Sequence, residues 1–522
     1  MKKLPIGIQS FRRMREDDFV YIDKTPLIER MTDGAGRYFL SRPRRFGKSL
    51  LVDTLRCLFE GHQELFTGLY IEDRWDWSQS FPVIKLDFAK GVIHSSEALA
   101  EQIDDLLRIN AQALSLEDDS SQGVTIRFAS LIRQARKKYG QSVVVLVDEY
   151  DKPILDNIDD PEMAAQMREG LKNLYSVLKS EDEYLHFVLM TGVTKFSKVS
   201  LFSGLNQLDD ITLDARYSTL CGYTQADLET HFAEHLEGVD WEQLKAWYNG
   251  YQFLGEAVYN PFDILLFISK GHSYRNYWFE TGSPSFLIKL FQQRQYFLPD
   301  LEALEVGEEI LDSFDVEQID PVTLLFQAGY LTIASQQTHL GGQPFYRLKI
   351  PNQEVRQALA TQFADSYTQR APSERTKAQL QLSEALSNGD LLLLEKTLQA
   401  LFSGIPWRNF TNNDLAESEG YYASVLYAFF TSLNAEIIPE DISSHGQADL
   451  TVKLGDYIYV MEIKRDTQDN YQQQSPNPAL QQIQEKGYSQ KYLASGKQVI
   501  ELGLIFNTQA RNLVQLDSQK IF

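Results

Sequence analysis

The sequence predicts an α/β protein of several domains, and three observations support this prediction. The chain has 522 residues, enough for about three domains. Strand-like and helix-like segments alternate through roughly the first 220 residues, as in a parallel sheet with helices on both faces. The C-terminal part mixes both kinds of element again. We therefore expect a parallel-sheet domain at residues 1–270, a mainly helical middle region at 271–372, and an α/β domain at 373–522.

Hydrophobic patterning predicts the elements of the first domain. Helical spacing of Leu99, Ile103, Leu106 and Leu107 predicts a helix, and the unbroken aliphatic run at 143–147 predicts a strand covered on both sides. The expected strands lie at 37–40, 83–88, 143–147 and 187–190, and the expected helices at 49–59 and 95–114.

The middle region shows a different pattern. An apolar run at 324–333, a turn at Gly342, a run at 346–351 and a helical pattern from 352 predict a helix, a β-hairpin and a second helix. A winged-helix-like lid and a helical linker with an incidental hairpin both fit. The polar stretch at 366–386 marks the next boundary.

Composition narrows the class of protein. The chain has 72 acidic and 50 basic residues, a net charge of −22, which disfavours a general nucleic-acid or anionic-membrane coat. The first 60 residues nevertheless hold 13 basic and 8 acidic side chains. Cys57 and Cys221 are too few for a disulfide framework, and no signal peptide or membrane span is visible. We expect a cytoplasmic protein that does not bind membranes.

A phosphate-binding loop is predicted between the first strand and the following helix, where residues 42–49 read RPRRFGKS. Backbone N–H groups near Gly47 would meet the phosphates, and the helix dipole adds to that attraction. Lys48 would reach the β- and γ-phosphates, and the Ser49 hydroxyl would bind Mg²⁺. Arg42 stands where the phosphate-loop pattern has its first Gly, and an ordinary helix start is the alternative interpretation.

Acidic and polar residues at the ends of two later strands strengthen this prediction. We expect Asp148 to hold Mg²⁺, directly or through water, and Glu149 to polarise the attacking water, although a helix cap is the structural alternative. Thr194 and Lys195 are candidates for a γ-phosphate sensor or for an ordinary capped loop. The candidate charge stabilisers, in cis or from a neighbouring subunit, are Arg44, Arg45 and Arg216.

Several of these segments together resemble an AAA-ATPase-like family found beside nuclease domains in bacterial and archaeal proteins. The matching segments are LPIG at 4–7, YIDKT at 21–25, RPRRFGKS at 42–49, DEYDKP at 148–153, TGVTKFS at 191–197, YNGY at 248–251 and YNPF at 259–262. The resemblance implies a P-loop NTPase-type sheet, ATP with Mg²⁺ as cofactors, and an absent first Gly as a normal feature. Related ATPases form rings, so a homo-oligomer is an open alternative.

Near the C-terminus, two β-rich runs flank Gly455-Asp456, which predicts a hairpin with a two-residue turn. If Leu454 pairs with Tyr457, Asp449 falls opposite Glu462, and Glu462 and Lys464 share a face. Two facing carboxylates repel each other unless a cation or a proton joins them. We therefore expect Asp449 and Glu462 to bind Mg²⁺ or Mn²⁺ with the Ile463 carbonyl, and Lys464 to orient the nucleophile. A surface hairpin with a salt bridge is the alternative.

This hairpin resembles the core of the PD-(D/E)XK nuclease superfamily, with Asp449, Glu462 and Lys464 at its signature positions and Ala448 in place of the proline. The resemblance covers about residues 375–522 and implies a restriction-endonuclease-like fold. It also implies an additional acidic ligand, Glu419, at the start of an apolar helix, and a glutamine near the site, Gln482.

Three hypotheses follow. The first is an ATP-driven protein whose nucleotide turnover controls a metal-dependent nuclease acting on DNA or RNA, in defence against mobile elements. The second is a nucleotide-dependent switch or scaffold whose nuclease-like domain binds nucleic acid or protein without cleaving. The third is a relic that hydrolyses no nucleotide.

Overall fold

The computed structural model describes residues 2–33, 36–195, 208–278, 300–301, 304–308, 320–338, 342–368, 372–405, 419–433, 435–469 and 471–521. Phe196 and Ser197 of the TGVTKFS segment lie outside these ranges. Contacts divide the chain into two compact units. Unit 1 comprises Met1–Phe286 and Leu304–Gln353, and unit 2 comprises Leu287–Ala303 and Glu354–Phe522. The three domains expected from the sequence remain a proposal. Within the described ranges, no helix has the length and apolar character needed to cross a membrane.

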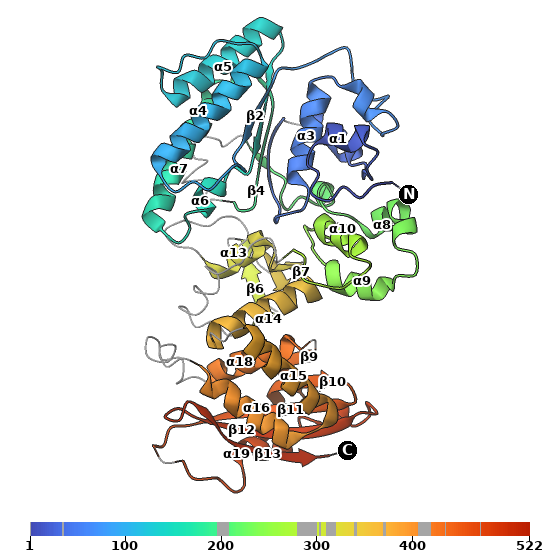
Figure 1. Cartoon of the computed structure of the whole chain (residues 1–522), viewed down its shortest axis with the longest axis vertical. Coiled ribbons are helices and arrows are strands. Elements are labelled where there is room, and N and C mark those ends of the chain that lie inside the picture. Colours follow the sequence, from blue (N-terminus) through green and yellow to red (C-terminus); the bar gives the residue numbers. More distant parts are fainter. Residues whose placement is uncertain are drawn as a thin grey trace. The chain divides into compact units, whose positions relative to one another are not determined.

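Unit 1 contains a five-stranded parallel sheet in the order β2-β3-β4-β1-β5. Figure 1 shows α4, α5 and α7 on one face and α1 and α3 on the other. The strands are β1 (Arg37–Ser41), β2 (Val83–Asp87), β3 (Val143–Asp148), β4 (Leu185–Gly192) and β5 (Asp209–Asp210). The helices are α1 (Phe11–Glu16), α3 (Lys48–Phe59), α4 (Ser96–Ala113), α5 (Val124–Tyr139), α6 (Lys152–Leu155) and α7 (Pro161–Ser180). The predicted α/β class and the six elements predicted in this region are confirmed.

The parallel arrangement brings distant polar residues to one edge of the sheet. All residues of β3 are buried, as its aliphatic run predicts, and the strand ends at Asp148. Asp87 pairs with Asp148 in register, and Ser41 pairs with Gly192. Because parallel strands all point the same way, the loops after β1, β3 and β4 leave from this edge, which is where ligands bind in such sheets.

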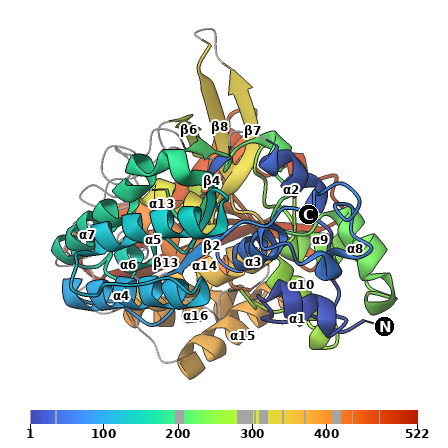
Figure 2. The ribbon, with the colours of Figure 1, turned by 90° about the horizontal axis from the view of Figure 1, so that it is seen from above.

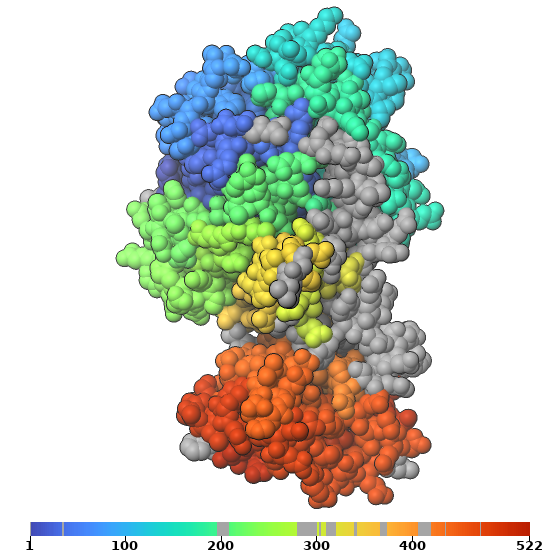
Figure 3. Space-filling model, turned by 180° about the vertical axis from the view of Figure 1, so that it is seen from behind, coloured from blue at the N-terminus to red at the C-terminus, as the bar shows by residue number. Residues whose placement is uncertain are grey.

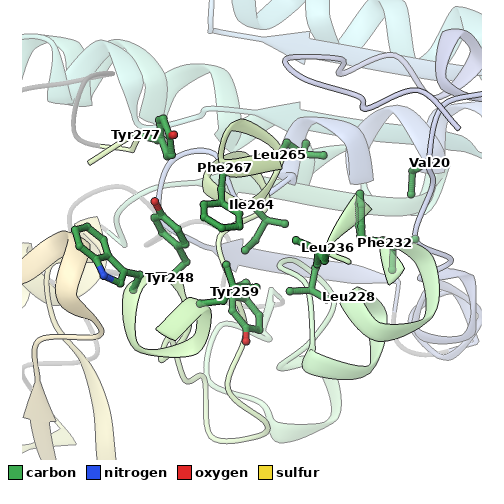
Figure 4. Close-up of a cluster of buried hydrophobic side chains, with 13 residues drawn as sticks. Val20, Leu228, Phe232, Leu236, Tyr248, Tyr259, Ile264, Leu265, Phe267 and Tyr277 are labelled. Carbon is green, nitrogen blue, oxygen red and sulfur yellow. The ribbon is translucent and has the colours of Figure 1, made fainter. Parts of the chain in front are cut away.

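A helical lobe follows the sheet in the chain. It contains α8 (Gln225–His231), α9 (Trp241–Tyr248) and α10 (Pro261–Ser269), whereas the short helix α2 (Thr25–Thr32) precedes β1 in the chain. Figure 4 shows Leu228, Phe232 and Leu236 packed beside Tyr259 and Ile264 in a shared apolar cluster. The Tyr248 and Phe267 rings add an aromatic contact at 5.7 Å between centroids. This cluster holds α10 in place, and the first residues of α10 line the nucleotide-sized cavity described below.

The middle region forms the predicted helix, hairpin and helix: α13 (Pro321–Ala328), β7 (Thr332–Thr338), β8 (Pro344–Lys349) and α14 (Gln353–Thr368). A third strand, β6 (Leu304–Gly307), was not predicted and pairs with β8. Figure 2 shows β7 and β8 extending side by side. In Figure 3 this yellow segment lies against the green residues of the helical lobe. Gln252 N donates to Thr332 Oγ1 at 2.8 Å across that contact.

Unit 2 contains a mixed sheet in the order β13-β12-β11-β10-β9, in which only the β11–β12 pair is parallel among the described strands. The strands are β9 (Glu436–Ser443), β10 (Gly446–Leu454), β11 (Tyr457–Asp466), β12 (Gln498–Asn507) and β13 (Asn512–Lys520). The helices are α15 (Pro372–Asn388), α16 (Leu391–Ser403), α18 (Glu419–Thr431) and α19 (Pro478–Lys486). Ile483 of α19 packs with Ala448, Ile458 and Val460 in an apolar cluster.

The predicted hairpin register is confirmed. Leu454 pairs with Tyr457, and the pairing continues in step to Leu450 with Met461. The turn has two residues, and Gly455 takes a φ of 57°, which explains a glycine at this position. The backbone pairing of β10 with β11 stops one step before Asp449 and Glu462.

Candidate functional site

The loop between β1 and α3 carries the predicted phosphate-binding residues. Gly47 caps α3 with a φ of 93°, and Arg45 also takes a positive φ of 69°. The left-handed conformation at Gly47 turns the chain so that α3 begins at Lys48, and an L-residue at this position would be strained. The free N–H groups of the first helical turn therefore lie directly after the loop.

A cavity of about 450 Å³ lies at this helix start. Six predicted residues line it: Arg44, Arg45, Gly47, Lys48, Ser49 and Glu149. Apolar side chains complete the wall, among them Pro5, Ile8, Met14, Tyr223 and Phe262. A charged end and an apolar end within one cavity suit a ligand that joins phosphates to a planar base.

Lys48 is buried and hydrogen-bonded in this structure. Its Nζ donates to the carbonyl oxygens of Arg42 at 2.9 Å and Pro43 at 3.1 Å. Burial lowers the pKa of Lys48, and attraction to Asp148, Glu149 and Asp151 opposes this effect. The ammonium group is therefore held beside three carboxylates by backbone carbonyls, which it can exchange for phosphate oxygens.

Asp148 is fully buried at the end of β3 and does not itself line the cavity. Its Oδ1 accepts hydrogen bonds from Thr191 Oγ1 at 2.7 Å and from the Glu149 N–H at 3.1 Å. Its Oδ2 has no donor among the described residues. Glu149, at a φ of 51°, does line the cavity, and burial raises its pKa. The raised pKa suits a group that accepts a proton.

Asp151 is a site residue that the sequence analysis missed. It lines the cavity and is buried, and its Oδ2 accepts from the N–H groups of Val193 at 3.0 Å and Thr194 at 2.6 Å and from Thr194 Oγ1 at 2.6 Å. Its Oδ1 has no donor within the described part of the chain. The sequence signal that could have identified Asp151 is a third acidic residue shortly after Asp148 and Glu149. With the orphaned Asp148 oxygen and the Ser49 hydroxyl, this set of hard oxygen donors fits Mg²⁺.

Acidic side chains hold both sensor candidates. The hydroxyl of Thr194 is occupied by Asp151 and its side chain is fully buried. Lys195 Nζ forms an ion pair with Asp210 Oδ2 at 2.5 Å, and Lys195 lines a different cavity. A side chain after a strand points to either face, and the packing against β5 and α13 directs Lys195 away from Lys48.

The arginine candidates divide into two groups. Arg45 lies over the Phe262 ring at 5.0 Å and lines the cavity, and Arg44 lies near enough to oppose the pKa rise of Glu149. Arg216 does not line the cavity. It pairs with Asp214, and its side chain is 62% exposed. Of the three candidates, Arg44 and Arg45 are the two that line the cavity at the start of α3.

In unit 2, Asp449 and Glu462 lie just beyond the end of the β10–β11 pairing, close enough for the charge of Asp449 to act on Glu462. Asp449 Oδ2 accepts a hydrogen bond from the Ile463 N–H at 2.7 Å. The N–H and C=O of one strand residue point to the same side, so the Ile463 carbonyl also faces the β10 side of β11. Burial raises the pKa of Asp449, and Glu419 and Glu440 raise it further. Glu440, in β9, is an acid that the sequence analysis did not select.

Glu462 is the most strongly perturbed carboxylate in the predicted set. Its side chain is 2% exposed, and its Oε1 accepts from Lys464 Nζ at 2.8 Å and from Gln482 Nε2. Its Oε2 is buried without a donor among the residues that the structure describes. Burial, with repulsion from Asp449 next, raises the pKa of Glu462 to about 7. Two carboxylates, those of Asp449 and Glu462, are near one ammonium group, that of Lys464, and a proton or a bound cation would supply the missing positive charge.

Glu419 and Gln482 lie in the same neighbourhood. Glu419 begins α18, its Oε1 accepts from the Arg465 N–H at 3.2 Å, and its charge acts on Asp449 and Lys464. Gln482 also donates to Tyr488 Oη at 3.3 Å. In the described ranges, no group of three or more His, Cys, Asp or Glu side chains is close enough to hold a metal ion. A cation here would rely on Asp449, Glu462 and the Ile463 carbonyl, which are oxygen donors of the kind that Mg²⁺ and Mn²⁺ prefer.

Comparisons with known proteins find separate family matches for an N-terminal part and a C-terminal part of the chain. A family described as "Predicted AAA-ATPase" matches residues 5–202, and the "PD-(D/E)XK nuclease superfamily" matches residues 417–516. An uncharacterized protein of the vnfD 5' region of Azotobacter chroococcum mcd 1 is 47% identical over 514 residues, which is 98% of each chain. No solved structure matches the chain.

Proposed function

The chain belongs to the family of proteins that join a predicted AAA-ATPase region to a PD-(D/E)XK nuclease superfamily region, and from this we propose that it hydrolyses ATP to control a metal-dependent nuclease. The substrate would be DNA or RNA, and the role would be defence against mobile elements. A separate set of residues supports each half of this proposal.

In the nucleotide half, the chain would bind the triphosphate through the first turn of α3 and through Lys48. Lys48 Nζ would exchange the Arg42 and Pro43 carbonyls for phosphate oxygens. Glu149, with its raised pKa, would accept the proton of the attacking water. Ser49, Asp148 and Asp151 would hold Mg²⁺, which would neutralise charge on the phosphates. Arg44 and Arg45 would add positive charge at the transferred group.

In the nuclease half, Asp449 and Glu462 would hold the divalent cation with the Ile463 carbonyl, and Glu419 would add charge. A bound Mg²⁺ or Mn²⁺ would supply Lewis-acid activation of water and of the phosphodiester. Lys464 and Gln482 both donate to Glu462, so they would fix the carboxylate and leave one oxygen free toward the ion. Lys464 would then orient the nucleophile.

The single observation that carries the nuclease proposal is the buried Glu462 Oε2, which has no donor in the described part of the chain although Oε1 of the same carboxylate has two. A structural carboxylate of this burial is normally satisfied on both oxygens. One free, buried oxygen beside a second carboxylate favours a cation site over a surface salt bridge.

Cleavage assays with full-length protein test the proposal. We expect Mg²⁺- or Mn²⁺-dependent cleavage of DNA or RNA that disappears in Glu462→Ala and Lys464→Ala while ATP hydrolysis persists. Glu485→Ala and Lys486→Ala, which alter exposed residues of α19, are the matched controls. Cleavage that survives both site substitutions would reject the assignment. The control of cleavage by nucleotide is tested by removing ATP and by Lys48→Ala. Each change should abolish cleavage.

A second candidate function is a nucleotide-dependent switch whose nuclease-like domain binds without cleaving. The lack of a described group of three metal-binding side chains and the net charge of −22 favour it. Calorimetric titration of Mn²⁺ into Lys48→Ala and into Lys48→Ala/Asp449→Asn separates the two functions. Equal heats in both proteins would support the switch, and heat lost with Asp449 would support the nuclease.

A further inference from the structure

A second cavity of unit 1, of about 570 Å³, lies at the first half of the phosphate-binding loop. Ser41, Arg42 and Pro43 line it, whereas residues from Arg44 onward line the nucleotide-sized cavity. Its volume falls within the range of about 300–1,000 Å³ that is usual for small-molecule sites. Phe253, Leu254, Leu213 and Phe326 give it an apolar wall.

Some of the charged side chains that line this cavity form ion pairs, and others form none among the described residues. Asp210 pairs with Lys195, and Asp214 pairs with Arg216. Two lining charges then remain without an ion pair among the described residues: Glu308, which is exposed, and Arg42, which is 1% exposed. Water screens the first charge far more than the second. Arg42 is therefore the buried charge of this lining that has no ion pair within the described ranges.

Arg42 is held in place without a carboxylate partner. Its Nη1 donates to the carbonyls of Ser41 at 2.9 Å and Thr212 at 2.7 Å, its Nη2 donates to that of Tyr217 at 3.2 Å, and its Cζ lies 3.8 Å from the Phe253 ring centre. Burial lowers the pKa of Arg42 to about 10, so it is charged at neutral pH. A buried charge without an ion pair is costly, and although the charge of Asp210 also acts on Arg42, an anion placed near the guanidinium would recover part of that cost.

Two N–H donors at the cavity wall also lack acceptors. Within the described ranges, neither Arg42 Nε nor Gln327 Nε2 has a hydrogen-bond partner, although Gln327 Oε1 accepts from the Lys195 N–H at 2.9 Å. Both nitrogen atoms are covered, so a ligand would reach them only after a small shift of a neighbouring side chain. The missing acceptors and the unpaired cation point to the same kind of ligand.

We propose that this cavity binds a small anionic molecule, with a carboxylate or phosphate group directed toward Arg42 and Lys195 and a planar apolar part against Phe253. Occupancy would alter the nucleotide site, because Lys48 Nζ donates to the backbone carbonyls of Arg42 and Pro43, two loop residues that also line this cavity. The coupling rests on the proposed ATP binding, whereas the anion site does not.

Benzoate and phenyl phosphate are the probes, with benzyl alcohol as the uncharged control, and binding to the full chain is measured by saturation-transfer NMR. The probes are used at up to about 10 mM, because ligands of this size bind in the millimolar range. We expect an anionic probe to bind the wild type and not Leu213→Trp, which fills the cavity. Ile126→Trp, at a 58% exposed position of α5, should bind like the wild type.

Two substitutions of opposite charge at Gln336, an exposed residue at the cavity rim, give a second test that preserves the fold. Gln336→Lys should tighten binding and Gln336→Glu should weaken it, each by about threefold to tenfold for a charge placed several ångströms away. The proposal is overturned if neither anion binds the folded wild type, if benzyl alcohol binds as well as the anions, or if both Gln336 variants bind equally.

The coupling is tested by titrating a fluorescent ATP analogue with and without the bound probe. A change in nucleotide affinity should be matched by an equal change in probe affinity when the analogue is bound. Probe binding without any such change would refute the coupling alone. A chain that binds the probe but no nucleotide would refute the proposed ATPase and leave the anion site intact.

Discussion

Replacing Glu462 by Gln removes a buried negative charge at the centre of the nuclease-like site. The pKa of Glu462 is about 7 in the folded chain, against a usual value of 4.5. A tenfold change in a proton-binding constant is worth about 1.4 kcal/mol, so the ionised carboxylate lowers the stability of the metal-free protein by up to about 3 kcal/mol. Screening by solvent reduces this to about 2 kcal/mol.

The direction of the pH effect on stability follows from the raised pKa of Glu462, which is an acid. Below about pH 4.5 the folded and unfolded chains both hold the proton, and the carboxylate has no pH-dependent effect. As the pH rises toward 7, the unfolded chain loses the proton first, and the folded state becomes progressively less stable. Glu462→Gln should therefore lie within about 1 kcal/mol of the wild type at pH 5 and exceed it by about 2 kcal/mol above pH 7.

The assay is chemical denaturation with a chelator present, across about pH 5 to pH 8.5, following the unfolding transition of unit 2. Glu485→Gln, at an exposed position of α19, is the control and should show no pH-dependent difference. Saturating Mn²⁺ should stabilise the wild type and leave Glu462→Gln unchanged. A stability difference between Glu462→Gln and wild type that is constant with pH would refute the argument that the free carboxylate oxygen is a cation site.

Three further predictions concern the two sites and the fold. Lys48→Ala should weaken binding of a fluorescent ATP analogue by more than about tenfold, since a charge-assisted bond to phosphate is lost, while Lys137→Ala, on an exposed face of α5, should not. Mn²⁺ should bind about tenfold more weakly at pH 6 than at pH 8 in calorimetry, because Glu462, with a pKa of about 7, must release its proton first. Gly503→Ala should destabilise unit 2 by about 2 kcal/mol in thermal unfolding, because its Cβ would lie 2.5 Å from Leu480 N, whereas Gly123→Ala has open space.

Local patterns were sufficient to predict much of the fold and of each site. The two-residue turn at Gly455 and the alternation along β10 and β11 set the register that brings Asp449 toward Glu462. The aliphatic run of β3 placed Asp148 at the edge of a parallel sheet, close to the loop that follows β1. The hairpin register follows from one short segment, whereas the approach of Asp148 to the loop after β1 also depends on the parallel order of the strands.

Features assembled from distant segments were not predictable in this way. The direction of Lys195 depends on Asp210 in β5 and on Gln327 in α13, and no sequence pattern links these positions. The pairing of β6 with β8 joins segments about 40 residues apart. The second cavity of unit 1 draws its wall from residues between Ser41 and Tyr346. Tertiary packing, which a single sequence does not display, decides all three.

Buried acids in unit 2 separate into two kinds, and the difference is testable. Asp441 has both oxygens satisfied: Oδ2 accepts from Thr451 Oγ1 at 2.7 Å and Tyr492 Oη at 2.6 Å, and Oδ1 accepts from Lys491 Nζ at 2.5 Å. Asp441→Asn should therefore destabilise the protein at neutral pH by about 1–3 kcal/mol, because Lys491 loses its partner. Glu462→Gln should do the opposite under the same conditions. If both substitutions lower the unfolding free energy alike, an unsatisfied carboxylate oxygen does not mark a functional acid in this fold, and Glu462 belongs with Asp441 among the structural ones.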